Sequence, residues 1–137
     1  MNNIREKIIV ALDTNNLKTA ESLVKVLSPY VNYFKIGLEL ATAVGVPQAV
    51  KMVHKLGSKV FYDGKFNDIP NTMAQAAKAI SDLGVSMFDV HASSGPEAVK
   101  AAVQNKGRSK ILGVTVLTSM SDVGDKILKF AKMLKIE

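Results

Sequence analysis

The feature that most constrains the fold is a regular alternation between short apolar runs and longer segments of helical periodicity. Five apolar runs occur, and each is followed by a segment of helical character. The runs are continuous rather than alternating, which is typical of parallel strands buried on both faces. The sequence therefore predicts an α/β fold of five consecutive parallel βα units in one domain. The predicted strands are Lys7–Leu12, Tyr33–Leu38, Lys59–Asp63, Ser86–His91 and Lys110–Leu117.

The segments between these runs carry apolar residues on one helical face, together with start and stop signals. Pro47 suits a first helical turn, and Gly57 and Gly84 suit helix ends. The predicted helices are Leu17–Leu27, Leu40–Val44, Pro47–Leu56, Asn71–Leu83, Pro96–Gln104 and Asp125–Lys135. From length alone, an open doubly wound sheet is the plainest interpretation, because a closed eightfold barrel needs ~250 residues and this chain has 137.

Composition excludes several classes of protein. The chain has no cysteine, so disulfide scaffolds, cysteine-ligated zinc and thiol catalysis are excluded. No apolar run approaches the ~20 residues of a membrane span, and the polar start does not resemble a signal peptide. We therefore expect a cytoplasmic location and no membrane partner. The 18 basic residues exceed the 12 acidic ones, but they are spread along the chain without interleaved aromatics, so we expect no nucleic-acid partner.

Charged residues gather where the predicted strands end, which is where ligands bind in parallel α/β folds. Asp13 ends the first strand, and Asp89 and His91 lie near the end of the fourth. Lys35 stands inside an otherwise apolar run. A buried lysine costs several kcal/mol unless it is paired. Lys35 is therefore either paired with an acid or extended so that its ammonium group reaches the edge of the sheet.

The segment after the third run adds charges of both signs. Asp63 and Lys65 point to the same face of an extended strand, and Asp68 precedes a helix that it could cap. We expect Lys35, Asp63, Lys65 and Asp68 to converge on one edge of the sheet. Such an array keeps a lysine protonated and an aspartate ionised. It suits a reaction in which negative charge builds up on a substrate carbon that then takes a proton.

The segment FYDGKFNDIPNT (Phe61–Thr72) resembles the signature Asp-x-Lys-Phe-His-Asp-Ile-Pro-Asn-Thr of the orotidine 5′-phosphate decarboxylase family. A bare Asp-x-Lys-x-x-Asp is shared with related sugar-phosphate lyases, whereas Ile-Pro-Asn-Thr is more specific. Asn67 stands where the family commonly has histidine, and we expect this difference to have a small effect. Other segments that resemble the family are Ile9–Asp13, Phe34–Leu40, Phe88–Gly95 and Val114–Ser119.

The resemblance implies part of a (β/α)₈ TIM barrel that this chain alone does not close. It implies a homodimer with shared active sites, and conversion of orotidine 5′-monophosphate to uridine 5′-monophosphate without a metal or an organic cofactor. Lys65 would be the general acid that protonates C6 of the pyrimidine, and Asp63 would lie against the departing carboxylate. Lys35 would position Asp63 and the ribose, and Asp13 would bind a ribose hydroxyl.

The resemblance also assigns residues outside this group. Asp68 and Thr72 would reach into the partner subunit's site, and Thr118 or Ser119 would lie beside the pyrimidine. The family's phosphate-binding segments have no counterpart among the 137 residues, so we expect either a shortened gene product or a part that assembles with something else. We expect negligible decarboxylation by this chain alone, and poor solubility or oligomers, because an open sheet leaves two edges unpaired.

Two other functions compete with decarboxylation. Mg²⁺-dependent sugar-phosphate lyases or aldolases of the same barrel family would use a glutamate such as Glu39 together with Asp63. A phospho-accepting receiver domain would suit the length, the five βα units and an aspartate after the third strand. It would also need an acidic pair after the first strand and a lysine after the fifth, where this chain has Asp13 alone and Thr118.

Overall fold

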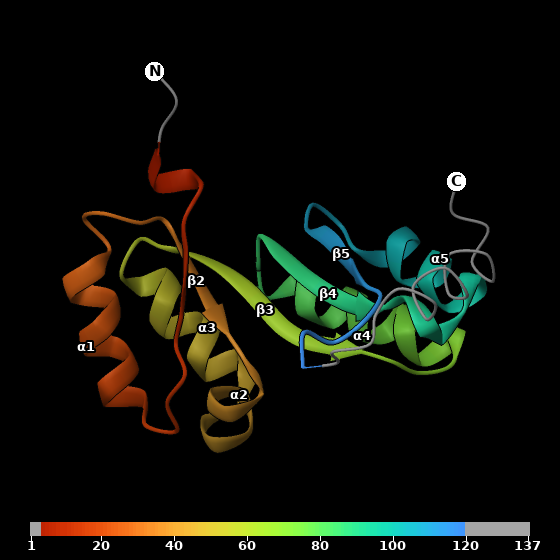
Figure 1. Cartoon of the computed structure of the whole chain (residues 1–137), viewed down its shortest axis with the longest axis horizontal. Coiled ribbons are helices and arrows are strands. Elements are labelled where there is room, and N and C mark those ends of the chain that lie inside the picture. Colours follow the sequence, from red (N-terminus) through yellow and green to blue (C-terminus); the bar gives the residue numbers. More distant parts are fainter. Residues whose placement is uncertain (1–3, 120–137) are drawn as a thin grey trace.

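A computed structural model describes residues 4–119 of the chain, in which strands and helices alternate (Figure 1). The order of elements is η1 (Ile4–Glu6), β1 (Ile9–Ala11), α1 (Leu17–Leu27), β2 (Tyr33–Ile36), α2 (Leu38–Val44), α3 (Val46–Lys55), β3 (Lys59–Phe66), α4 (Pro70–Asp82), β4 (Met87–His91), η2 (Ala92–Ser94), α5 (Pro96–Asn105) and β5 (Lys110–Val114). No helix in this part of the chain is both long and apolar enough to cross a membrane.

The strands form one parallel sheet in the order β1-β2-β3-β4-β5, the same as their order along the chain. Since parallel crossovers are right-handed, steps that all run in one direction place every crossover helix on the same face of the sheet. A doubly wound sheet instead reverses direction, as in the order 2-1-3-4-5. The five parallel strands with helices between them are therefore confirmed, whereas the open doubly wound arrangement suggested by length is wrong.

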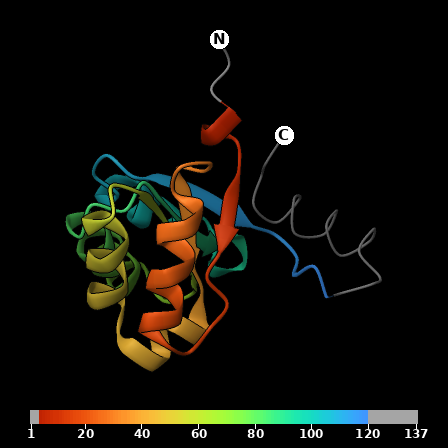
Figure 2. The same ribbon diagram turned by 90° about the vertical axis from the view of Figure 1, so that its left-hand side faces the viewer.

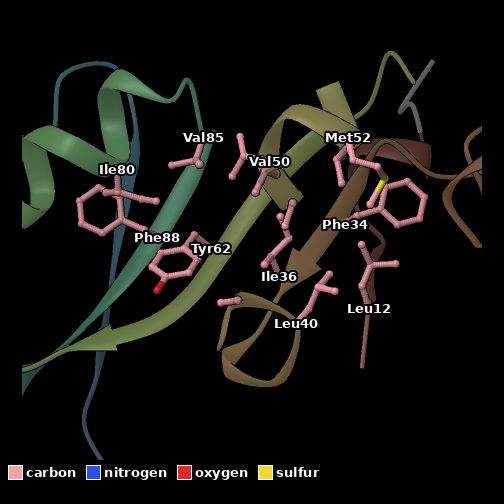
Figure 3. Close-up of a cluster of buried hydrophobic side chains, with 14 of the residues drawn as sticks. Leu12, Phe34, Ile36, Leu40, Val50, Met52, Tyr62, Ile80, Val85 and Phe88 are labelled. Atoms are coloured by element: carbon pink, nitrogen blue, oxygen red, sulfur yellow. The ribbon is translucent and has the colours of Figure 1, made fainter. Parts of the chain in front are cut away.

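The hydrophobic core lies between the sheet and these helices (Figure 3). Phe34 and Ile36 of β2, Leu40 of α2 and Phe88 of β4 are fully buried, and Leu12 after β1 joins them. Each such side chain contributes roughly 1.5–3 kcal/mol to the free energy of unfolding. This layer fixes which side of each strand faces the helices and which side faces away.

The opposite side of the sheet, here called the open face, carries Ile9, Lys35, Asp63, Asp89 and Leu112. These residues alternate along their strands with the buried ones, and neighbouring strands are in register. Ile9 is 41% exposed and Leu112 is 43% exposed. The expected burial of both faces is therefore wrong for residues 4–119, because the helices of this part cover only one face.

The observed boundaries differ most at strand ends. Helix α1 has the predicted bounds, but β3 continues to Phe66 and β5 stops at Val114. Beyond β5, the segment 115–119 leads away from the helices (Figure 2). The predicted helix Asp125–Lys135 lies outside the described residues.

Candidate active site

The end of β3 is irregular where the charged residues lie. Tyr62 pairs with Phe88, but the next paired residue of β3 is Phe66, opposite Val90. Between these two pairs, β3 therefore advances by four residues while β4 advances by two, which is a β-bulge with extra residues on β3. Lys65, within the bulge, has a φ of 47°, a left-handed conformation that non-glycine residues rarely adopt. The bulge redirects the backbone between Asp63 and Lys65, so simple alternation no longer describes it.

Gly64 makes this bulge possible. A Cβ atom at this position would lie 2.7 Å from the Tyr62 hydroxyl oxygen and closer still to two carbons of its ring. Tyr62 is itself buried, and its ring centroid lies 5.7 Å from that of Phe66. The ring therefore has little room to move, and the close approach of the backbone to the aromatic ring requires glycine.

Asp63 lies between two lysines. Its Oδ2 is 3.3 Å from Nζ of Lys35, and its Oδ1 accepts a hydrogen bond from Nζ of Lys65. The Asp63 side chain is only 13% exposed. Each carboxylate oxygen thus faces one ammonium group in a partly desolvated place, where such pairs interact more strongly than in water. The lysine inside β2 is paired, as one of the two sequence interpretations requires.

Asp13 lies at the edge of this group. Its Oδ1 is 3.8 Å from Nζ of Lys35, and its side chain is 68% exposed. Asp13 follows Ala11 by two residues, and Ala11 is opposite Lys35 in the β1–β2 register, so β1 places it near Lys35 without burying it. Its carboxylate remains accessible to a ligand.

Asp89 is a fourth member of the group that the sequence assignments did not include. It is 4% exposed, and its Oδ1 accepts the backbone N–H of Lys65 at 2.7 Å. Its Oδ2 is 3.9 Å from Nζ of Lys65. A charged residue inside an apolar strand is the same signal that pointed to Lys35. We call Lys35, Asp63, Lys65 and Asp89 the charge cluster.

The charge cluster sets the protonation of its members. Burial, together with the neighbouring Asp63, raises the pKa of Asp89 to about 6, against the effect of the Lys65 backbone N–H. Burial also acts to raise the pKa of Asp63, but hydrogen bonds with Lys65, Asp89 and Lys35 outweigh it, so this pKa is lowered. The hydrogen bond to Asp63 raises the pKa of Lys65. At neutral pH, Lys65 is therefore an ammonium group and Asp63 a carboxylate.

Asp68 and Thr72 lie apart from the charge cluster and are exposed. Oδ1 of Asp68 accepts the N–H of Ile69 at 2.7 Å. Ile69 is the residue that precedes α4, and no side chain caps the start of this helix. Asp68 is therefore neither the expected helix cap nor, among residues 4–119, a member of an ion pair with Lys35 or Lys65. The chain has already left the sheet after Phe66, which carries Asp68 away.

Thr118 and Ser119 are exposed in a turn beyond β5, and within residues 4–119 neither forms a hydrogen bond with the charge cluster. Glu39 is exposed on α2. Within residues 4–119, no three His, Cys, Asp or Glu side chains are grouped closely enough to hold a metal ion. Mg²⁺ can be held by one or two carboxylates together with substrate oxygens, so a site with Glu39 and Asp63, as in a related lyase, stays an alternative prediction.

Comparison with known proteins gives the family. The sequence model of the orotidine 5′-phosphate decarboxylase / HUMPS family matches residues 6–133. The chain belongs to this family. It is 50% identical over 125 residues to orotidine 5′-phosphate decarboxylase of Moorella thermoacetica, covering 85% of this chain and 49% of the relative. For the Geotalea daltonii enzyme of the same name, identity is 43%, with 86% and 52% covered. The chain thus spans about half the length of these curated relatives.

Solved structures agree on the fold. An uncharacterized conserved protein from Geobacillus kaustophilus is 28% identical with a TM-score of 0.81, covering 93% of this chain and 68% of that one. Orotidine 5′-phosphate decarboxylase from Lactobacillus acidophilus is 33% identical with a TM-score of 0.75, covering 96% and 67%. The partial-barrel fold is confirmed. The alternative of a receiver domain is wrong, because the strand order of a receiver sheet reverses direction, whereas the strands of this chain follow one another in sequence order.

Proposed function

We propose that this chain supplies the reaction centre for decarboxylation of orotidine 5′-monophosphate to uridine 5′-monophosphate. The observation that carries the proposal is the Lys65 ammonium group bonded to Asp63, with Lys35 at the other oxygen of the same carboxylate. These are the residues to which the family resemblance gives catalytic roles. The relatives from Moorella thermoacetica and Geotalea daltonii, which carry the decarboxylase name, support the same activity.

Lys65 would perform the proton transfer. When the bond between C6 and the carboxylate carbon breaks, CO₂ leaves and the electron pair stays on C6, where delocalisation is small. An ammonium group already fixed beside C6 stabilises this charge without reorganisation of solvent. Lys65 then donates one N–H proton to C6, and its neutral amine recovers a proton from water. The raised pKa of Lys65 keeps the proton in place until the charge develops.

Asp63 and its neighbours would orient the substrate around that step. The ionised Asp63 would lie against the substrate carboxylate, and repulsion between the two would favour loss of CO₂. Lys35 would hold Asp63 in position and contact the ribose, because its ammonium group lies between Asp63 and Asp13. The exposed Asp13 carboxylate would accept a hydrogen bond from a ribose hydroxyl.

The remaining assignments concern groups outside the charge cluster. Thr118 or Ser119 would lie beside the pyrimidine, and Asp68 and Thr72 would enter the site of a second subunit in a homodimer. The exposure of all four residues leaves them accessible for these contacts. The homodimer stays a prediction that follows from the resemblance, and the cytoplasmic location stays a prediction that follows from the composition.

The proposal is tested in a chimera in which this chain replaces the segment that it matches in the Moorella thermoacetica decarboxylase. Release of labelled CO₂ from carboxyl-labelled substrate measures turnover. Replacing Lys65 by alanine should lower kcat at least ~100-fold, because it removes both the cation and the proton donor. The control is Lys78→Ala, since Lys78 is 62% exposed and pairs with Asp82 on the same helix, and it should leave kcat unchanged. An inactive chimera, or a Lys65→Ala variant of full activity, would overturn the proposal.

A further inference from the structure

Asp89 is a buried acid that the mechanism above does not use. It belongs to β4 and is 4% exposed, although it lies on the open face. Isolated burial of a carboxylate costs several kcal/mol, so a buried acid needs partners. Its polar partners among residues 4–119 all belong to β3, where the bulge lies against it. The placement of Asp89 is therefore tied to the geometry of the bulge.

The two carboxylate oxygens of Asp89 lie near two different parts of Lys65, its backbone and its side chain. Oδ1 accepts the backbone N–H of Lys65 at 2.7 Å, and Oδ2 lies 3.9 Å from its Nζ. The backbone contact is short and charge-assisted, which makes it one of the stronger kinds of hydrogen bond. Lys65 is also the residue with the left-handed φ of 47°. A non-glycine residue persists in that conformation only where its surroundings hold it.

We propose that Asp89 is a positioning residue that holds Lys65 in its left-handed conformation and thereby keeps the Lys65 ammonium group against Asp63. The catalytic consequence of this role rests on the function proposed above, whereas the positioning itself does not. Without the Oδ1 acceptor, the Lys65 backbone relaxes towards a common conformation and its side chain leaves Asp63. Asp89 touches no reacting atom and acts through Lys65.

The surroundings of Asp89 make this role sensitive to pH. The titratable groups of β3 that interact electrostatically with it are Asp63 and Lys65, on the same face, and Tyr62, on the core side. Its register partner on β5 is the apolar Leu112, and His91 lies two residues further along the same face of β4. With a pKa of about 6, Asp89 is a carboxylate at neutral pH and becomes neutral below it. Protonation weakens its hold on Lys65 without removing the acceptor oxygen.

The test compares Asp89→Ala, which removes both oxygens, with Asp89→Asn, which keeps one acceptor oxygen but no charge. NMR of the chain itself gives the readout, because it needs no turnover. In Asp89→Ala, the Lys65 amide proton should move upfield and exchange with solvent at least ~10-fold faster, and the Lys65 side-chain pKa should fall. In Asp89→Asn, the amide should stay protected while the pKa still falls. Asp82→Ala, which removes an acid that is 65% exposed, is the matched control and should change neither.

Kinetics of the chimera supply the second arm. Asp89→Ala should lower kcat ~10-fold or more with KM nearly unchanged, because a displaced Lys65 misses C6. Asp89→Asn should restore most of that loss at neutral pH and remove the dependence of kcat on pH near 6. An unchanged Lys65 amide and pKa in Asp89→Ala would overturn the proposal, and where that variant does not fold, loss of protection at the Lys65 amide in Asp89→Asn, which keeps the acceptor oxygen, would do so. NMR changes in a chain whose chimera is inactive would leave the positioning role standing and remove the decarboxylase function.

Discussion

The Nζ atom of Lys35 lies 3.3 Å from Oδ2 of Asp63, on the side of that carboxylate opposite Lys65. The contact joins the open face of β2 to the end of β3, next to the place where the bulge begins. The Asp63 carboxylate thus binds two ammonium groups, one from Lys35 of β2 and one from Lys65 of β3. The two lysines have different tasks as a result: Lys65 can give up a proton, whereas Lys35 keeps Asp63 ionised and in place.

Removing Lys35 tests this division of tasks. In Lys35→Met, Asp63 loses one of the hydrogen-bonding cations that lower its pKa, so that pKa should rise. In the chimera, kcat/KM should fall by roughly 10- to 100-fold. The acidic limb of the profile of kcat/KM against pH should move to higher pH. Carboxyl ¹³C NMR of Asp63 and a pH–rate profile measure the two effects. The control is Lys25→Met, because Lys25 is exposed and pairs with Glu21 on the same helix. An Asp63 pKa that does not move would contradict the assignment of Lys35.

Asp89 should make a distinct contribution to the pH dependence of the chain's stability. The pKa of Asp89 is raised from 3.8 to about 6, so the folded chain binds a proton more tightly than the unfolded chain does. The free energy of unfolding should therefore fall as pH rises from about 4 to about 7, by on the order of 3 kcal/mol from this group. Asp63 has the opposite effect, in a lower pH range. Because its pKa is lowered in the folded chain, it stabilises the fold above pH ~4, and this contribution is lost in stronger acid.

Urea unfolding of the chain and of Asp89→Asn at several pH values separates this effect from the rest. Asparagine does not titrate, so the variant should lack the fall between pH ~4 and ~7. It should also gain stability relative to the unsubstituted chain as pH rises. Parallel pH dependence in the two proteins would show that Asp89 titrates normally.

The bulge should tolerate no side chain at position 64. Gly64→Ala should lower the free energy of unfolding by roughly 1–3 kcal/mol, because the new Cβ meets the buried Tyr62 ring. Gly113→Ala is the matched control, since a Cβ on that glycine of β5 would meet nothing within 4 Å. Thermal or urea unfolding measures both variants. Equal stability of the two would mean that the ring moves aside without cost.

The open face should make the isolated chain self-associate. Ile9 and Leu112 expose apolar area there, on the two edge strands β1 and β5, and exposed apolar edges favour association. Size-exclusion chromatography with light scattering should find oligomers, and the double variant Ile9→Lys with Leu112→Lys should shift them towards the monomer. A monodisperse monomer of the unsubstituted chain would contradict this expectation.

Much of the fold follows from local patterns in the sequence. Helix α1 has its predicted bounds because Asn16 accepts the N–H groups of Lys18 and Thr19 and so fixes where the helix begins. The continuous apolar runs gave the strands, but they could not show that one face would lack a covering layer. The local sequence pattern could not predict the order of the strands in the sheet either. The direction in which each crossover steps depends on tertiary packing, which local periodicity does not encode.

The site was predicted in part, for a similar reason. Lys35, Asp63 and Lys65 stood out because charges in or after apolar strands need partners, and the structure brings them together. Asp89 carried the same signal but received no role, since only the shifted register between β3 and β4 turns the Lys65 N–H towards it. Asp68 lies beyond the point where the chain leaves the sheet, and within residues 4–119 it forms no ion pair with Lys35 or Lys65.

In the proposed reaction, the Lys65 ammonium group exchanges a proton with C6 of the pyrimidine. By microscopic reversibility, a group that protonates C6 also removes the proton from the product. The most direct measurement is therefore ¹H NMR of 5-fluorouridine 5′-monophosphate in D₂O with the chimera, since fluorine stabilises the C6 anion and speeds exchange. The account predicts replacement of the C6 hydrogen by deuterium, and no detectable replacement with Lys65→Ala. Exchange that continues at an undiminished rate without Lys65 would contradict it.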